Sequence, residues 1–527
     1  MLAVTLVALG GSPALADPLP ASAALVLELR APTADQLDAP LNVAAIALEL
    51  HATAMPGDRV IELRARRNGH PVLRLSLDAG DVSHTARIEL LIGRNQIAVE
   101  ALAASGQMSR FELTLRRNRT TGDDALPAMP AAGEARTLRG DWHITRELIV
   151  PAGASLTLAA GCVMRFAPGI GIECRGRIVS EGTAGQPVWL LPAASSSDWP
   201  GVLIAGPAAS ATFSHTHWRG ASGHTNQWRN GRTIAGSESV APVARGAEGT
   251  DGGGLMLLGC GAPVALVDCS FVDCRALAGA GDDASGTGGT GGTGGTGGAM
   301  FVERSTAMLE RCRFERCRAA RDGGAVLGYQ RSNLLFATCT FVGNTAGRDG
   351  GALTLLMNNS ADLARVTLRG NAAGRSGGAI NVNRDAVATL RDCVLTDNAA
   401  HSGGALLATH NESATLMSCL LRGNVARFEG GAVFLGAGNR ATRLSDCRVL
   451  DNRAGTTGGG ITLLDCAPRV TGCEVSGNHA GVATAAGGMA VRYSKRFTDA
   501  RLDRETLIGA NDFLNNDPAD LVIDTVD

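Results

Sequence analysis

Two acidic residues at equivalent positions of a sequence repeat are the first candidates for catalysis. Asp322 and Asp349 each precede a Gly-Gly pair and lie 27 residues apart. If these positions stack in successive repeats, their carboxyl groups reach the separation of about 5–5.5 Å that retaining glycoside hydrolases use. Arg321 and Arg348 precede the same acids, so a solvated ion-pair ladder without catalytic function is the alternative. Because register repetition alone produces such a ladder, the sequence favours it.

A second candidate surface is a polar stripe that follows the Gly-Gly marks. It mixes an aromatic ring with amide, hydroxyl, guanidinium and imidazole groups, a combination suited to holding a sugar chain. Its members are Tyr329, Thr354, Asn381, Asn383, Arg384, Thr409 and His410. We take Tyr329, Asn381, Asn383, Arg384 and His410 as candidate ligand-binding residues, and His410 also as a candidate for catalysis. An ordinary polar exterior is the alternative.

Metal ligands are a third possibility, which the sequence supports little. His215 and His217 alternate on one expected strand, as an exposed pair also would. We find no three acidic residues on adjacent repeats of the kind that a calcium site needs. Cys274 and Cys317 lack Cys or His partners at zinc-ligand spacing. We therefore expect no cofactor, with calcium as an unsupported alternative.

The elements that must position these residues are repeats of about 27 residues. Gly-Gly precedes Ala325, Ala352, Ala379, Ala405, Ala432 and Gly460, and a second series consists of Asn344, Asn371, Asn398, Asn424, Asn452 and Asn478. Each unit also holds three short runs in which alternate residues are apolar. Such strands bury a face only when repeat stacks on repeat. This pattern predicts an all-β fold, a right-handed parallel β-helix with three sheets.

Each repeated residue type has a physical reason in such a stack. Gly-Gly allows positive φ and close backbone approach at a corner. Asn can bond the coils above and below and tolerates a left-handed corner. An apolar residue three before each Asn fills the interior, and Trp218, Phe271 and Phe314 occupy the same place in earlier coils.

Thirteen cysteines would suggest disulfides in an exported protein. Seven of them share one repeat position: Cys269, Cys312, Cys339, Cys393, Cys419, Cys447 and Cys473. Stacked strands hold Cβ atoms about 4.8 Å apart, whereas a disulfide needs roughly 3.5–4.5 Å. We therefore expect a ladder of buried thiols. Cys274 and Cys317, which replace Asn in adjacent coils, are the candidates for a disulfide.

Composition divides the chain into four parts. Residues 1–16 end in an Ala-Leu-Ala pattern typical of signal-peptide cleavage. Residues 24–117 alternate as the antiparallel strands of a small β-sandwich do. Residues 118–139 have the Pro, Gly and polar residues of a linker, and residues 140–527 form the β-helix. Inserts interrupt it at about 219–250 and 276–298, the second with flexible Thr-Gly-Gly units.

Three segments resemble known families. Residues 150–158, Val-Pro-Ala-Gly-Ala-Ser-Leu-Thr-Leu, resemble the opening coils of right-handed parallel β-helix proteins, which have a pectate-lyase-like fold. Residues 93–101 resemble the last strands of bacterial immunoglobulin-like modules, which implies a spacer or attachment role. Phe341-Val342-Gly343-Asn344 and Gly350-Gly351-Ala352-Leu353 resemble the repeats of polymorphic outer-membrane proteins, which implies adhesion at a cell surface.

The net charge and the lengths of the apolar runs limit which partners and locations the sequence favours. The chain has 48 basic and 50 acidic residues and a net charge of −2, so nothing favours binding to nucleic acid. No apolar run reaches the length of about 18 residues that spans a bilayer. We expect an exported protein, extracellular, periplasmic or at the cell surface, without a transmembrane segment.

The function that we expect is a scaffold that binds a carbohydrate or a surface partner without catalysis. β-Helices also carry polysaccharide lyases and glycoside hydrolases, so such an enzyme acting on the lateral face is the alternative. A third possibility is that the β-helix is mainly structural and that the β-sandwich mediates attachment.

Overall fold

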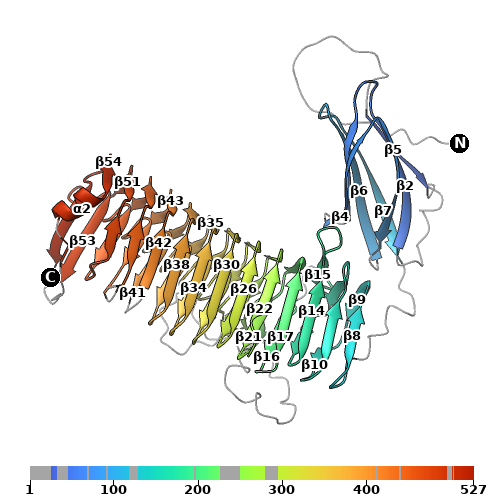
Figure 1. Cartoon of the computed structure of the whole chain (residues 1–527), viewed down its shortest axis with the longest axis horizontal. Coiled ribbons are helices and arrows are strands. Elements are labelled where there is room, and N and C mark those ends of the chain that lie inside the picture. Colours follow the sequence, from blue (N-terminus) through green and yellow to red (C-terminus); the bar gives the residue numbers. More distant parts are fainter. Residues whose placement is uncertain are drawn as a thin grey trace. The chain divides into compact units, whose positions relative to one another are not determined.

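The computed structural model forms two compact units, which are described separately (Figure 1). It describes residues 25–31, 45–67, 70–90, 93–117, 129–194, 198–225, 250–278, 295–409, 413–437, 439, 441–494, 501–502 and 504–526. The signal-like segment 1–16 and most of both predicted inserts lie outside these residues.

The first unit is a pair of antiparallel sheets. One has the order β1–β2–β5, with β1 (Val26–Ala31), β2 (Ala45–Thr53) and β5 (Asp81–Glu89). The other has the order β4–β3–β6–β7, with β4 (His70–Ala79), β3 (Val60–Arg67), β6 (Gly93–Ala103) and β7 (Met108–Arg117). Alternate residues such as Leu48, Leu63 and Val99 are buried in one core. The predicted small β-sandwich is confirmed.

The second unit is a parallel β-helix whose coils each contribute one strand to three long sheets (Figure 1). In sheet I, the strands from β21 to β53 follow Gly-Gly. The sheet contains β10 (Leu148–Val150), β13 (Ile172–Cys174), β16 (Val202–Ala205), β21 (Leu255–Leu258), β25 (Met300–Glu303), β29 (Val326–Tyr329), β33 (Leu353–Leu356), β37 (Ile380–Asn383), β41 (Leu406–Thr409), β45 (Val433–Leu435), β49 (Ile461–Leu464), β53 (Met489–Ser494) and β55 (Leu521–Val526).

Sheet II follows sheet I in each coil. It contains β8 (Ala135–Leu138), β11 (Ser155–Leu158), β14 (Arg177–Glu181), β17 (Ser210–Ser214), β22 (Val264–Val267), β26 (Thr306–Glu310), β30 (Asn333–Ala337), β34 (Ser360–Ala364), β38 (Val387–Arg391), β42 (Ser413–Met417), β46 (Arg443–Ser445) and β50 (Arg469–Thr471). The predicted C-terminal boundary of the linker, residues 118–139, is wrong, because β8 within it pairs in register with β11. The stack therefore begins before Gly140.

Sheet III precedes the Asn series. It contains β9 (Asp141–Ile144), β12 (Val163–Phe166), β15 (Val188–Pro192), β18 (Thr216–Arg219), β23 (Ser270–Val272), β27 (Arg313–Glu315), β31 (Thr340–Val342), β35 (Thr367–Arg369), β39 (Val394–Thr396), β43 (Leu420–Arg422), β47 (Arg448–Leu450), β51 (Glu474–Ser476) and β54 (Asp512–Leu514). A helix, α2 (Arg504–Ala510), lies between β53 and β54 in the chain.

A fourth sheet of two-residue strands follows the Asn series. Sheet IV contains β24 (Arg275–Ala276), β28 (Arg318–Ala319), β32 (Thr345–Ala346), β36 (Ala372–Ala373), β40 (Ala399–Ala400), β44 (Val425–Ala426), β48 (Arg453–Ala454) and β52 (His479–Ala480). A separate antiparallel pair joins β19 (His224–Thr225) to β20 (Thr250–Asp251). The sequence predicts three sheets and misses sheet IV, because two-residue strands show no alternation to detect.

The Asn ladder is buried and fully bonded. Asn371 Nδ2 donates to Asn398 Oδ1 at 3.0 Å and to the carbonyl of Phe341 at 3.2 Å. The expectation that these Asn residues are left-handed is wrong: positive φ falls on the preceding residues, such as Gly370 (62°) and Asp397 (58°). That residue makes the bend, so that the Asn side chain can reach the neighbouring coils.

The interior contains an aromatic stack at the predicted positions. The ring centroids of Trp218 and Phe271, Phe271 and Phe314, and Phe314 and Phe341 are 4.5, 5.0 and 4.6 Å apart, with interplanar angles of 3–14°. Stacked rings at this spacing add to the stabilisation from burial. Register pairing of β18, β23, β27 and β31 places the four rings in one column.

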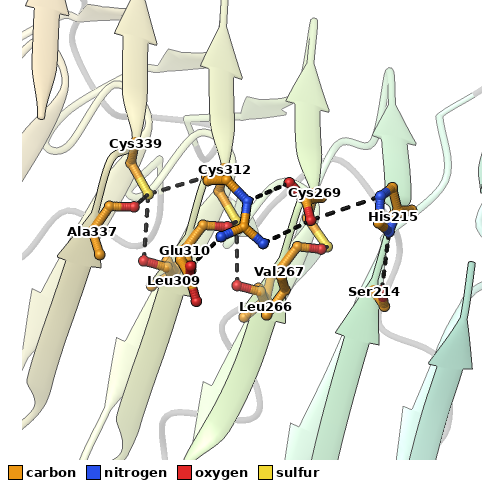
Figure 2. A network of polar contacts seen from close by, with 12 residues as sticks. Ser214, His215, Leu266, Val267, Cys269, Leu309, Glu310, Cys312, Ala337 and Cys339 are labelled. Carbon is orange, nitrogen blue, oxygen red and sulfur yellow. Dashed lines mark hydrogen bonds and ion pairs between the residues drawn. The ribbon is translucent and has the colours of Figure 1, made fainter. Parts of the chain in front are cut away.

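The cysteines form the expected buried thiol ladder (Figure 2). All thirteen are free and buried. The Cys312 thiol donates to the carbonyl of Leu266 at 3.5 Å and that of Cys339 to the carbonyl of Leu309 at 3.4 Å. The predicted Cys274–Cys317 disulfide is wrong: both thiols are free, because the in-register pairing of β24 with β28 keeps the two residues at strand spacing.

Candidate ligand-binding groove

The predicted acid pair lies in the corner between sheets IV and I. Asp322 and Asp349 form consecutive β-bridges there and are only 2% and 4% exposed. Arg348 donates to both carboxylate oxygens of Asp322, at 2.9 and 2.5 Å, and Arg375 binds both oxygens of Asp349. The ion-pair ladder is therefore present, in a buried rather than a solvated form.

Burial dominates the electrostatics of this corner. Desolvation raises the pKa of Asp322, although the hydrogen bonds from Arg348 act in the opposite direction. Because each carboxylate is enclosed and bound by a two-pronged guanidinium, neither presents an oxygen to a substrate. The geometry gives the pair a structural role, since an unpaired buried charge would be costly.

The predicted polar stripe divides between the two ends of the sheet I strands. Tyr329, Asn383 and Thr409 lie in one partly exposed column, which Leu356 interrupts. Asn381 is 1% exposed beside the Gly377 corner, so the expectation that it faces solvent is wrong. Arg384 is exposed at a left-handed turn position with a φ of 61°. His410 lies outside the described residues.

A groove of about 320 Å³ lies elsewhere, on the outer face of sheet II. It crosses strands β22, β26, β30, β34 and β38. Its floor consists of outward-facing apolar side chains from successive coils: Ala265, Val267, Met308, Leu335, Ala337 and Ala364. Met308 is 47% exposed, so the floor is open to a ligand.

Strand register explains how these side chains come together. One outward column reads Thr212, Ala265, Met308, Leu335, Asp362, Thr389 and Thr415. Its ends carry the polar residues expected of a solvent-facing position, and its middle is apolar. Side chains one coil apart are separated by about 4.8 Å, so the apolar members make a continuous surface.

The rim of the groove is ionic. Arg391 Nη1 donates to both carboxylate oxygens of Asp362, at 2.7 and 2.9 Å. Glu310, at the other end of the groove, is bound by Arg311. Both pairs are partly or fully exposed, so they contribute orientation and specificity for a ligand more than stability.

Glu310 connects the groove to a polar network at the adjacent corner (Figure 2). Arg311 donates to both oxygens of Asp268, at 2.8 and 2.9 Å, and His215 Nε2 lies 3.7 Å from Asp268 Oδ2. The hydrogen bond from Arg311 holds the pKa of Asp268 below its usual value, and Asp268 raises the pKa of Arg311. One side of the groove therefore carries fixed charges of both signs.

The carboxylates of the groove are not arranged as those of a retaining glycoside hydrolase are. Glu310 and Asp362 belong to strands two coils apart, which separates their backbones by at least about 9.6 Å. Retaining glycoside hydrolases hold their carboxyl groups about 5–5.5 Å apart. Each acid is also engaged by a guanidinium. Among the described residues, no group of three or more His, Cys, Asp or Glu side chains is arranged to hold a metal ion.

Sequence reasoning missed the groove, although a signal for it exists. Met308 and Leu335 occupy a position at which other coils carry Thr, Asp or Ala. Apolar residues at a solvent-facing position of consecutive repeats indicate a binding surface. The signal is visible only after the inward and outward positions of each short strand have been assigned.

A match to a family model supports the fold. A family model described as "Right handed beta helix region" matches residues 354–495. No curated protein matches the chain. The catalytic unit of a thermostable GH87 alpha-1,3-glucanase from Streptomyces thermodiastaticus strain HF3-3 is similar in structure, with a TM-score of 0.37 and 11% identity over 92% of this chain and 87% of that chain.

No helix formed by the described residues is long and apolar enough to cross a membrane. The resemblance of the repeats to polymorphic outer-membrane proteins stays a prediction. The family match and the parallel strand order together make residues 354–495 part of a right-handed β-helix.

Proposed function

We propose that this protein is an exported β-helix scaffold that binds a polysaccharide in the groove of sheet II without cleaving it. The observation that carries the proposal is the groove itself, with an apolar floor of about six side chains and an ionic rim. A sugar ring presents an apolar C–H face and a polar edge of hydroxyl groups. Such a ligand matches a concave, mainly apolar site in which a few polar groups set orientation.

The absence of catalysis is part of the proposal. Asp322 and Asp349 are buried against guanidinium groups, and Glu310 and Asp362 are ion-paired in separate coils. Export is proposed from the signal-like residues 1–16, and a role at the cell surface from the resemblance of the repeats. An adhesin-like function would combine these features.

The test is to block the groove and measure binding on a glycan array. Met308→Arg places a long charged side chain on the floor, so binding should fall by about tenfold or more, as expected when about 1.4 kcal/mol of contact is lost. Thr415→Arg is the matched control, because Thr415 occupies the same outward column beyond the groove. Equal binding by the two variants would contradict the proposal.

The enzymatic alternative is decided in the same experiment. Glycans that bind are incubated with the protein, and reducing ends and unsaturated uronates are measured. We expect neither product. Release of either product by the wild-type protein would overturn the non-catalytic assignment, and its loss in His410→Ala would favour a glycoside hydrolase or polysaccharide lyase.

A further inference from the structure

The corner before Gly-Gly changes its chemistry partway along the stack. In the coils of Asp322 and Asp349 it carries the buried Arg–Asp ladder. In the next two coils after Arg375, this corner position is occupied by His401 and then by Phe428. Backbone hydrogen bonds from Ser402 N to the Arg375 carbonyl and from Phe428 N to the His401 carbonyl show this order. His401 and Phe428 thus occupy the positions of the arginines, while Glu429, which follows Phe428, is buried and ion-paired with Arg492.

His401 and Phe428 form a flat surface. Their ring centroids are 5.6 Å apart, and the planes differ by 12°. Phe428 is 45% exposed, and it is the only exposed Phe, Tyr or Trp side chain in the part of the chain that the structure describes. The other described Phe, Tyr and Trp side chains are buried or half-buried, so the Phe428 ring alone among them is exposed enough to stack with a ligand.

Two hydroxyl-bearing residues adjoin the ring residues, one along the chain and one in the next coil. Ser402 adjoins His401, and the Thr456 hydroxyl donates to the Phe428 carbonyl at 2.8 Å in the next coil. Arg375, which has 55% of its side chain exposed, is neutralised by Asp349. The surface therefore combines aromatic faces, hydroxyl groups and an imidazole, with no cluster of unpaired cations in this corner that would favour a phosphate backbone.

We propose that His401 and Phe428 form a second glycan-binding point, separate from the groove, on which a sugar ring stacks. The C–H face of the ring packs on Phe428 and His401, while its hydroxyl groups reach Ser402 and Thr456. This second site and the groove would bind the same class of ligand, but each could exist without the other. A nucleic-acid base could stack on the same rings, but the net charge of −2 favours an uncharged or weakly charged polymer.

Affinity electrophoresis of the full chain tests the site. Native gels contain dextran, soluble xylan or polygalacturonate, and the retardation of each variant gives an apparent affinity. Phe428→Ala and His401→Ala should bind at least one polysaccharide about threefold to tenfold more weakly, because each removes a stacking contact. Val425→Ala is the matched control, since Val425 is 42% exposed in the same coil.

Met308→Arg separates this site from the groove. If Met308→Arg abolishes retardation while Phe428→Ala has none of the expected effect, the groove stands and the second site is overturned. If Phe428→Ala weakens retardation and Met308→Arg does not, the second site stands and the groove fails. Retardation of the wild-type protein by none of the three polysaccharides, or by single-stranded DNA instead, also overturns the second site.

Discussion

Single residues in this β-helix act through what lies one coil away. Asp322 is a carboxylate in a nearly dry corner, and its partner Arg348 comes from the following coil. The pair illustrates a general property of stacked repeats. A charged side chain that would be an ordinary surface group in an isolated coil becomes buried when the next coil is added, and the same coil supplies the counter-charge.

Arg348→Ala should destabilise the protein by about 3–5 kcal/mol at neutral pH, because it leaves Asp322 buried and unpaired. Removing the hydrogen bonds that lower the pKa of Asp322 lets desolvation raise it further above 3.8. Between pH 3.8, where Asp322 titrates in the unfolded chain, and its higher pKa in the folded variant, the native state binds more protons than the unfolded state. The free energy of unfolding therefore falls as the pH rises through this range. The penalty should therefore shrink when the pH is lowered.

Thermal and urea unfolding at several pH values measure the effect. Arg391→Ala is the control, since the Asp362–Arg391 pair is 41–47% exposed and should contribute only about 0–1 kcal/mol. Similar losses for the two variants, or a penalty for Arg348→Ala that does not depend on pH, would contradict a buried charge at Asp322.

At the scale of elements, the Gly-Gly corners set how closely coils can stack. The first Gly of each pair has positive φ, for example 63° at Gly350. The second is crowded by the next coil: a Cβ on Gly351 would lie 2.1 Å from the Gly378 carbonyl oxygen. A side chain at the second position would force the coils apart, and one at the first would collide with the strand that follows in the same coil.

Gly377→Ala and Gly370→Ala separate conformational strain from crowding. The two glycines have φ values of 63° and 62°. An added Cβ at Gly377 would lie 2.1 Å from the Ile380 carbonyl oxygen, and one at Gly370 would meet nothing within 4 Å. Gly370→Ala should cost about 1–2 kcal/mol from the left-handed conformation alone. Gly377→Ala should cost at least about 2 kcal/mol more, and equal melting temperatures would rule out the crowding.

At the scale of the whole molecule, stacking hides every thiol. The thirteen cysteines occur along the β-helix from Cys162 to Cys473, and all are buried. Burial raises the pKa of Cys174 and that of Cys466 to about 12. The thiolates of Cys174 and Cys466 are therefore scarce at neutral pH. Burial keeps reagents away from all thirteen thiols, so the protein should resist oxidation while it is folded.

Titration with Ellman's reagent checks this expectation without mutagenesis. The native protein should show no rapidly reacting thiol among the buried cysteines, and the protein unfolded in guanidinium without reductant should show thirteen. A count of two fewer after unfolding would indicate a disulfide, with Cys274 and Cys317 as the first pair to examine by mass spectrometry.

The start of the stack can be tested by truncation. A chain beginning at Met129 keeps β8, and one beginning at Gly140 loses it and uncovers the edge of β11. Leu138, which is 1% exposed, is lost as well. We expect the shorter chain to melt at a lower temperature, because burying a Leu side chain contributes about 1.5–3 kcal/mol. Identical melting of the two chains would place the start of the β-helix at Gly140, as the sequence predicts.

The sequence by itself determined the fold, because every coil of a stacked repeat has the same pattern of Gly-Gly, Asn and apolar positions. The Gly-Gly and Asn series, with the aromatic position of Phe271 and Phe314, predict coils, ladders and a stacked interior. The same repetition correctly favours a thiol ladder over disulfides at the seven shared Cys positions. Periodic constraints of this kind depend on neighbouring coils only, so they can be read from spacing.

The tertiary structure alone decided what is exposed. Asp322, Asp349 and Asn381 are buried in the stack, whereas Met308 and Leu335 remain open on the outer face of sheet II. Alternation within a strand of three to five residues does not say which face is covered. That depends on how the turns fold back, and on which side chains from separate coils meet in one groove.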